Sequence, residues 1–178
     1  MIISFVGFKQ IGKTTAAKYM EETYGFRRIN MKDALVAEVR ANFPDLLELM
    51  ADGLTVDDLF IQKPPLMRAL LQNYGTEVRR KDDEKYWTQQ WRAEATEQGG
   101  HIVVDDVRFH NEAEAVRGFN GVIVRLTRPD VETGGSHSSE VEQLEIKEDY
   151  AIECEKGDFE KLYKELDVIM AMHGQAKV

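Results

Sequence analysis

A glycine-rich string near the start of the chain combines residue types that together bind phosphate groups. Residues 7–14 read GFKQIGKT, which is glycine, four residues, glycine, lysine and threonine. Glycines let the backbone wrap tightly, so that several N–H groups point at one phosphate chain, and a following helix adds its positive N-terminal end. In such a P-loop, Lys13 would reach the outer phosphates of a nucleoside triphosphate and the Thr14 hydroxyl would coordinate Mg²⁺.

The surroundings of this string favour a nucleotide site. The string follows the apolar run IISFV over residues 2–6, and residues 13–23 after it have the apolar spacing of a helix. The alternative is an ordinary strand–turn–helix corner that merely needs two glycines. We take ATP as the nucleotide. We expect it to contact the two glycines and the residues that open the helix: Gly7, Gly12, Lys13, Thr14 and Thr15.

Two aspartates follow a second apolar run, which reads IVVDD over residues 102–106. A carboxylate at the exit of a strand beside a P-loop is the usual partner of Mg²⁺, through water. Alternate residues face opposite sides of a strand end, so Asp105 and Asp106 compete for this role. Capping of the following turn is the alternative for one or both.

The elements that must position these residues alternate between strand and helix, which predicts an α/β fold with a parallel sheet of about five strands. Strands are expected over residues 2–6, 26–29, 101–104, 121–126 and 150–153. Helices are expected over residues 13–23, 31–42, 65–80, 83–98, 111–119 and 158–172. Residues 44–62 look irregular, with or without short helices, and residues 127–139 look like a mobile loop. We expect 2–6 to be the central strand, flanked by 102–106, with ligands at the carboxyl ends of both.

Length, charge and cysteine content bound the remaining choices. The 178 residues fit one domain, and a net charge of −9 argues against a broad surface for a nucleic-acid polymer. One cysteine excludes an intrachain disulfide and fits a reducing compartment. The apolar run at the N-terminus has no basic leader and is too short to span a bilayer, so we expect a cytoplasmic protein without a membrane segment.

Four strings together resemble phage-type deoxynucleoside monophosphate kinases. The first is the P-loop itself, with a lysine two residues after its first glycine. The other three are RALLQNYGTEVRR over 68–80, DVRFHNE over 106–112, and RLTRP over 125–129 with SHSSE over 136–140. Trp87 follows the second string at a similar distance. Each later string is weak alone, but the four occur in the order seen in that family and cover most of the chain.

The resemblance implies an enzyme that transfers the γ-phosphoryl group of ATP to a deoxynucleoside 5′-monophosphate, giving the diphosphate and ADP, with Mg²⁺ as cofactor. It implies a three-layer P-loop nucleotide-kinase fold in one domain over residues 1–178. An acceptor-binding helical region would cover about 31–98 and a lid about 127–140. A phage-encoded enzyme of this kind would serve deoxynucleotide metabolism in the host cytoplasm.

The resemblance also assigns roles to single residues. Lys13, Asp106 and Arg128 would be catalytic, and Arg128 would also contact ATP. Asp106, in preference to Asp105, would hold Mg²⁺ with Thr14, partly through water. The acceptor would be bound by residues of the P-loop, the helical region and the lid: Lys9, Asp33, Arg68, Arg80, Trp87, Arg108, Ser136, His137 and Glu140. One departure concerns residues 32–36, KDALV, which lack the lysine that relatives have after the leucine.

Several of these residues also have purely structural alternatives. Arg80 lies at a predicted helix end, where a cation complements the helix dipole. Arg68 could be a solvated helix residue, and Trp87 could pack in the core. His137 could be an ordinary loop histidine. Glu112 could cap its own helix as readily as take part in catalysis.

Two rival functions fit the P-loop. The closer rival is a kinase of the same fold that acts on another small phosphorylated acceptor. The other is a P-loop ATPase or regulatory nucleotide-binding module, although the chain has no Asn-Lys-x-Asp string of the kind that guanine-specific switches carry. The sequence leaves open which bases are accepted, whether ribose is rejected, whether the chain is a monomer or a homodimer, and what residues 44–62 do.

Overall fold

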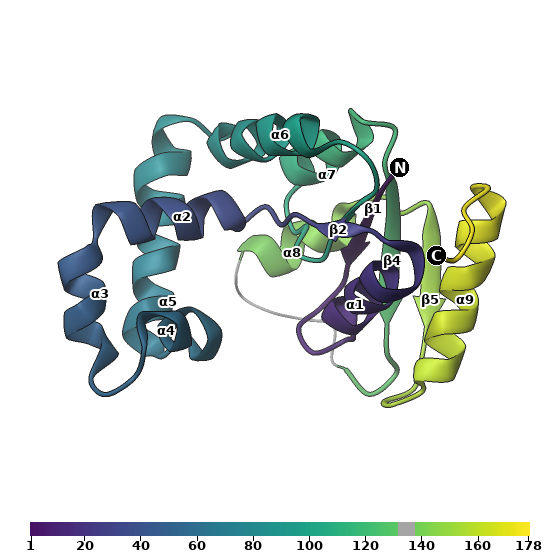
Figure 1. Cartoon of the computed structure of the whole chain (residues 1–178), viewed down its shortest axis with the longest axis horizontal. Helices are drawn as coiled ribbons and strands as arrows, with labels where there is room; N and C mark the ends of the chain where they lie inside the picture. The colour runs from purple at the N-terminus through teal and green to yellow at the C-terminus, as the bar shows by residue number, and fades with distance from the viewer. Residues whose placement is uncertain (132–137) are drawn as a thin grey trace. The chain divides into compact units, whose positions relative to one another are not determined.

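The computed structural model describes residues 1–131 and 138–178, apart from the side chains of residues 138–140 (Figure 1). The described chain forms two compact units. One comprises residues 1–30 and 94–178 and is called the sheet unit here; the other comprises residues 31–93 and is called the helical unit. No described helix combines the length and apolar character needed to cross a membrane.

The sheet unit is built on five parallel strands in the order β2-β3-β1-β4-β5. The strands are β1 (Ile2–Val6), β2 (Arg27–Arg28), β3 (Ile102–Val104), β4 (Val122–Thr127) and β5 (Tyr150–Glu153). Ser4 of the central strand lies opposite Val104 on one side and Ile123 on the other. The predicted α/β class, the five-stranded parallel sheet and the central place of residues 2–6 are confirmed. Because all strands are parallel, their carboxyl ends meet at one edge of the sheet.

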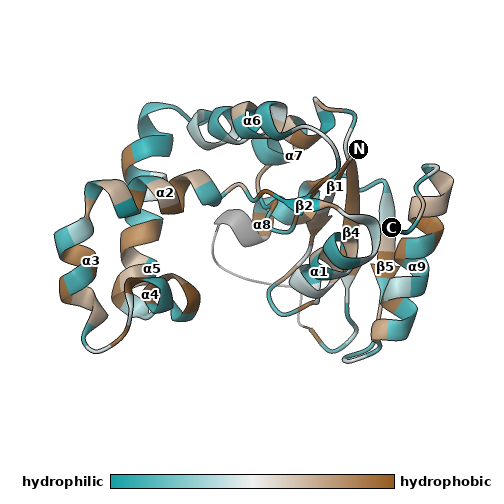
Figure 2. Cartoon of the chain, viewed as in Figure 1, coloured by the Kyte–Doolittle hydropathy of each residue, from teal (hydrophilic) through white to brown (hydrophobic). Residues whose placement is uncertain are grey.

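Helices cover both faces of this sheet. They are α1 (Lys13–Tyr24), α7 (His110–Arg117), α8 (Ser138–Glu145), α9 (Phe159–Met172) and the last turns of α6 (Tyr86–Gln98). Ile3 and Phe5 of β1 share one hydrophobic cluster with residues of α1 and α9. On the opposite face, a Cβ added to Gly121 would come within 2.6 Å of Val116 on α7 and within 3.2 Å of Ile2. Since both faces are buried, four of the five residues of β1 are apolar (Figure 2), and the exception, Ser4, is buried with its hydroxyl donating to the Val122 carbonyl oxygen.

The helical unit is a bundle of short helices with its own core. Its elements are α2 (Asp33–Asn42), α3 (Pro44–Ala51), α4 (Val56–Gln62), α5 (Pro65–Gln72), the π-helix η1 (Asn73–Arg80) and the start of α6. The core gathers buried side chains from five of these elements and from the start of α6: Val39, Leu47, Leu59, Phe60, Met67, Tyr74 and Trp87.

Residues 44–62 contain two short helices, α3 and α4, which is one of the two forms that the sequence left open. Pro44 occupies the first turn of α3, where a missing N–H costs nothing, so it starts a helix as well as ending the one before. Thr55 and Asp58 form a reciprocal capping box at the start of α4, with the Asp58 N–H donating to Thr55 Oγ1 over 3.1 Å. Local signals for both helices were therefore present but short.

Two differences from the predicted elements concern helices. The predicted helix over residues 65–80 changes at Asn73 from α-helix to π-helix. Residues 138–145 form α8, although the sequence pattern suggested a loop up to residue 139 and no element after it. Val141 and Leu144 of this helix are half exposed, so it shows no clear apolar stripe. At the other end of the chain, Asp158 caps the last helix, since its carboxylate accepts the Lys161 N–H over 3.0 Å.

Candidate active site

The glycine-rich loop joins the carboxyl end of β1 to α1 and is shaped by three residues with positive φ. Gly7 has φ +142°, and a Cβ there would lie 2.5 Å from the Leu126 carbonyl oxygen on the neighbouring strand, so only glycine fits. Gly12 has φ +109° and Gln10 has φ +64°. These left-handed positions curl the loop back on itself, which is the backbone shape that a phosphate cradle requires.

The first turn of α1 presents groups suited to phosphate and metal. Gly12 is the N-cap and has no side chain to satisfy the first N–H groups, and the turn contains no acidic residue. A phosphate oxygen can take the place of the missing cap and is favoured by the helix dipole. Thr14 is exposed and Thr15 is half-buried, so a hydroxyl of this turn is accessible to a ligand of the loop.

The Lys13 ammonium lies over the loop that precedes it. Its Nζ donates to the carbonyl oxygens of Gly7 over 2.6 Å and Phe8 over 2.7 Å. Both contacts are with backbone of the P-loop, so the positive charge of Lys13 lies against this loop. Lys9, inside the same loop, is exposed.

Arg128 reaches the P-loop from the end of β4. Its Nη1 donates to the Gln10 carbonyl oxygen over 2.8 Å, while Nε and Nη2 form a two-point ion pair with Asp130 over 2.9 and 2.6 Å. The hydrogen bonds that Arg128 donates to the Asp130 carboxylate raise the pKa of Arg128 and lower the pKa of Asp130. The side chain is only 15% exposed, so this cation is fixed against the P-loop.

The two aspartates after β3 have different surroundings. Asp105 is buried, its Oδ2 lies 3.4 Å from Arg28 Nη1, and its backbone N–H donates to Asn30 Oδ1 over 2.9 Å. Asp106 is half-buried. The pairing of Ser4 with Val104 brings the end of β3 beside the end of β1, from which the P-loop starts. Because Asp105 is buried and Asp106 is only half-buried, Asp106 is the more accessible of the two carboxylates at this edge.

These groups fit a magnesium ion bound together with a nucleotide. The described residues contain no group of three or more His, Cys, Asp or Glu that could hold a metal alone. Mg²⁺ does not need such a cage, because it keeps several waters and is held by one or two protein oxygens and by phosphates of the substrate. The Thr14 hydroxyl and the Asp106 carboxylate would supply these protein oxygens.

Glu112 has a capping role in the structure. Its Oε2 accepts the backbone N–H groups of Arg108 over 2.8 Å and Phe109 over 3.2 Å, at the start of α7. Of the two roles left open for Glu112, the structure shows this one. The Arg108 side chain itself is exposed.

The remaining candidates of the helical unit are spread over several elements. Asp33 is the first residue of α2, and Arg80 is the last residue of η1. Arg68 is exposed, and its Nε donates over 2.7 Å to the carbonyl oxygen of Lys63, the C-cap of α4. Arg68 is thus an exposed helix residue that accounts for a carbonyl group at the end of α4. This agrees with the structural alternative, a solvated helix residue.

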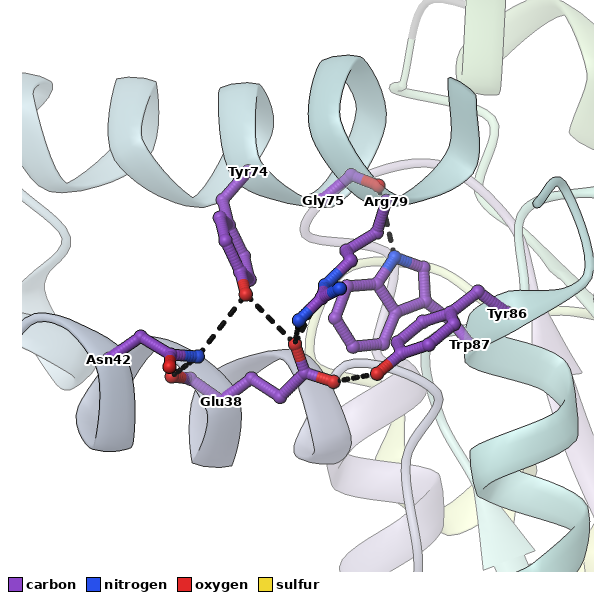
Figure 3. Close-up of polar contacts among 7 residues, drawn as sticks. All are labelled: Glu38, Asn42, Tyr74, Gly75, Arg79, Tyr86 and Trp87. Carbon is purple, nitrogen blue, oxygen red and sulfur yellow. Dashed lines mark hydrogen bonds and ion pairs between the residues drawn. The ribbon is translucent and has the colours of Figure 1, made fainter. Parts of the chain in front are cut away.

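Trp87 belongs to the core of the helical unit. It is 3% exposed, and its indole N–H donates to the Gly75 carbonyl oxygen over 3.0 Å (Figure 3). Of the two roles that the sequence left open for Trp87, packing is the one observed. In the predicted lid, Ser136 and His137 lie outside the described residues, and so does the side chain of Glu140, which belongs to α8.

Sequence reasoning missed three residues that hold the site together. Asp130 pairs with Arg128, whereas Arg28 and Asn30 hold Asp105. The signal for Asp130 was present, because an Arg-Pro-Asp string favours a turn that brings its first and third side chains together. Arg28 and Asn30 gave no such signal, since their contact with Asp105 depends on the pairing of β2 with β3.

Known proteins and a protein-family model are similar to this chain over most of its length. The family model described as deoxynucleotide monophosphate kinase matches residues 56–166. A protein of Acanthamoeba polyphaga mimivirus that carries the provisional name deoxynucleotide monophosphate kinase is 26% identical over 183 aligned positions, which cover 93% of this chain and 94% of that protein.

Solved structures with a similar fold are more distant in sequence. The structure of TT1252 from Thermus thermophilus has a TM-score of 0.54 at 17% identity and covers 97% of both chains. Shikimate kinase from Aquifex aeolicus has a TM-score of 0.51 at 15% identity and covers 98% of both chains. At this level of identity the likeness concerns the fold, and it agrees with a three-layer kinase architecture around a parallel sheet.

Proposed function

Because the chain belongs to the deoxynucleotide monophosphate kinase family, and is therefore a phosphotransferase, we propose that it transfers the γ-phosphoryl group of ATP to a deoxynucleoside 5′-monophosphate. An oxygen of the acceptor phosphate attacks the γ-phosphorus, the bond from that phosphorus to the β–γ bridging oxygen breaks, and ADP leaves. The acceptor oxygen is already anionic, so no general base is required. Catalysis then consists of positioning and neutralisation of charge.

The observation that carries the proposal is the P-loop with two cations fixed on it. The loop and the first turn of α1 hold the phosphates of ATP through backbone N–H groups. Lys13 exchanges its carbonyl partners for oxygens of the β- and γ-phosphates. Arg128 stays on the rim of the loop and neutralises the transferred group. Mg²⁺, held by Thr14 and Asp106 partly through water, supplies further neutralisation of the phosphate oxygens.

Binding of the acceptor is assigned to residues that the family resemblance names and that ATP does not use. In the sheet unit these are Lys9 and Arg108, both exposed. In the helical unit they are Asp33 and Arg80. Trp87 is left out of this set because it is buried and its indole N–H contacts the Gly75 carbonyl oxygen, and Arg68 is left out because its Nε contacts the Lys63 carbonyl oxygen. The lid residues Ser136, His137 and Glu140 keep the role that the family resemblance implies.

A panel of acceptors offered with ATP and Mg²⁺ tests the proposal. Release of ADP in a coupled assay should rise by at least ~10²-fold over the rate with water alone when one or more deoxynucleoside monophosphates are added. Ribonucleoside monophosphates and other phosphorylated small molecules complete the panel. ADP release that depends only on another phosphorylated acceptor would assign the enzyme to the rival kinase class, and release that no acceptor increases would identify an ATPase or regulatory module.

Arg128→Ala should slow transfer more than it weakens the binding of ATP. The guanidinium lies on the P-loop rim, where charge on the γ-phosphoryl oxygens develops during transfer, so its loss should reduce kcat by about 10²-fold. The dissociation constant of ATP, measured by calorimetry, should change by less than about threefold. A loss of affinity with unchanged kcat would contradict this role. Arg117→Ala removes a comparable arginine–aspartate pair elsewhere in the sheet unit and serves as the control.

A further inference from the structure

Glu38 of α2 is the centre of a polar cluster inside the helical unit, and nothing in the proposed chemistry uses it. Figure 3 shows its carboxylate between two helices, facing two tyrosines and an arginine. Oε2 accepts from the Tyr74 hydroxyl over 3.0 Å and from Nε and Nη2 of Arg79 over 2.9 Å each. Oε1 accepts from the Tyr86 hydroxyl.

Both oxygens of the Glu38 carboxylate accept hydrogen bonds, and the residues around it also contact one another. The Arg79 guanidinium lies over the rings of Tyr74 and Tyr86, at 5.4 and 5.0 Å from their centroids. Asn42, one turn along α2, donates to the Tyr74 hydroxyl over 3.2 Å. Burial alone would raise the pKa of Glu38, but the hydrogen bonds from both tyrosines and from Arg79 outweigh it and lower the pKa. The carboxylate is therefore charged at neutral pH and compensated.

The spacing of its partners connects Glu38 to the shape of η1. Tyr74 and Arg79 are five residues apart and donate to the same oxygen atom. Residues five apart share a face of a π-helix, whereas in an α-helix the shared face belongs to residues three and four apart. The Lys81 N–H likewise bonds to the Thr76 carbonyl oxygen, five residues back. One carboxylate thus contacts the pair of side chains that only the π-helical register brings together.

A π-helix of this length needs such support, because the α-helical form of the same residues is normally the more stable one. A π-helix also turns less per residue than an α-helix, so the direction of a side chain at its end depends on which form is present. Arg80 is that last residue. Arg79, its neighbour, is paired with Glu38. The two adjacent arginines therefore have different roles, since the proposed function assigns Arg80 to the acceptor.

We propose that Glu38 is a positioning residue that selects the π-helical register of Asn73–Arg80 and thereby sets the direction of Arg80 for the acceptor. This inference rests on the proposed function, in which Arg80 contacts the acceptor. Glu38 touches neither nucleotide. Its loss should therefore act through the acceptor alone and leave the P-loop unchanged.

The test compares Glu38→Gln with the wild type and with Asp57→Asn. The control removes the partner of Arg40 in an exposed ion pair of the same unit. In Glu38→Gln we expect the KM for the deoxynucleoside monophosphate to rise about tenfold, with the dissociation constant of ATP unchanged within about twofold. Amide hydrogens of residues 73–80 should exchange at least ~10-fold faster. Asp57→Asn should change none of these. Tyr86→Phe, which keeps the ring and removes one donor, should give a smaller change in the same direction and serves if Glu38→Gln does not fold.

The possible outcomes separate this inference from the proposed function. Unchanged hydrogen exchange over residues 73–80 in Glu38→Gln would overturn the assignment of the register to Glu38, whether or not the enzyme transfers phosphate. Faster exchange with an unchanged KM for the acceptor, or with an equal loss of ATP affinity, would overturn the positioning role. A wild-type enzyme that transfers no phosphoryl group to any deoxynucleoside monophosphate would instead refute the proposed function, and the exchange data would still decide the role of Glu38 in the helix.

Discussion

Lys13→Ala should reduce phosphoryl transfer by at least ~10³-fold, which corresponds to about 4 kcal/mol of transition-state stabilisation. The ammonium lies over the P-loop, 2.6 and 2.7 Å from two of its carbonyl oxygens. It is therefore already at the position where negative charge would gather on the β- and γ-phosphates. Alanine has no charged group, so the substitution removes the Lys13 charge from the loop.

The fold should survive this change. The hydrogen bonds from Lys13 to the Gly7 and Phe8 carbonyl oxygens involve a charged donor, and their loss should cost roughly 1–3 kcal/mol in total, which is a fraction of the stability of a domain of this size. Circular dichroism and thermal unfolding should therefore resemble those of the wild type. Lys18→Ala, in the same helix, removes a lysine in an exposed ion pair with Glu22 and should keep its turnover within about twofold. Unchanged turnover in Lys13→Ala would remove the P-loop from the mechanism.

Asp106→Asn and Asp105→Asn should fail in different ways. Asp106 is the accessible carboxylate at the edge where the P-loop begins, so its neutral isostere should reduce kcat by about 10²-fold and raise the concentration of Mg²⁺ required. Asp105 is buried and paired with Arg28. Its substitution leaves that cation with less compensation and should cost roughly 1–3 kcal/mol of stability.

Turnover and thermal unfolding of both variants separate these roles. Asp106→Asn should unfold at the temperature of the wild type and be slow, whereas Asp105→Asn should unfold at a lower temperature and keep most of its kcat when folded. The reverse pattern would transfer the metal role to Asp105. Normal activity and stability in both variants would show that neither carboxylate serves the site.

The features of the fold that could be predicted are those with local signals. The apolar run before GFKQIGKT predicted a buried strand, and its two glycines predicted a tightly wrapped loop, in which Gly7 and Gly12 have positive φ. Alternation of strands and helices predicted the parallel sheet, and hence the edge where Lys13 and Asp106 meet the strand ends. The matches from Gly7 to Glu140 likewise predicted the family to which the chain belongs.

The features that could not be predicted depend on contacts between distant segments. The residues of η1 have ordinary helical spacing, and their π-helical form follows from Glu38, which lies 36 residues before Tyr74 in the sequence. The burial of Trp87 depends on packing against residues of α2 to η1, and its indole N–H is satisfied by the Gly75 carbonyl oxygen. The difference between Asp105 and Asp106 depends on Arg28, which the sequence alone does not bring beside β3. Such pairings are tertiary, so patterns within one segment do not contain them.

The measurement that tests the central claim most directly follows the phosphoryl group itself. The enzyme is incubated with Mg²⁺, ATP that carries a label in its γ-phosphoryl group, and a single deoxynucleoside monophosphate, and the products are separated. The proposed reaction predicts that the label leaves ATP and enters the deoxynucleoside diphosphate, in an amount equal to the ADP formed, and that Lys13→Ala forms both products at least ~10³-fold more slowly. Label released only as inorganic phosphate would contradict the claim.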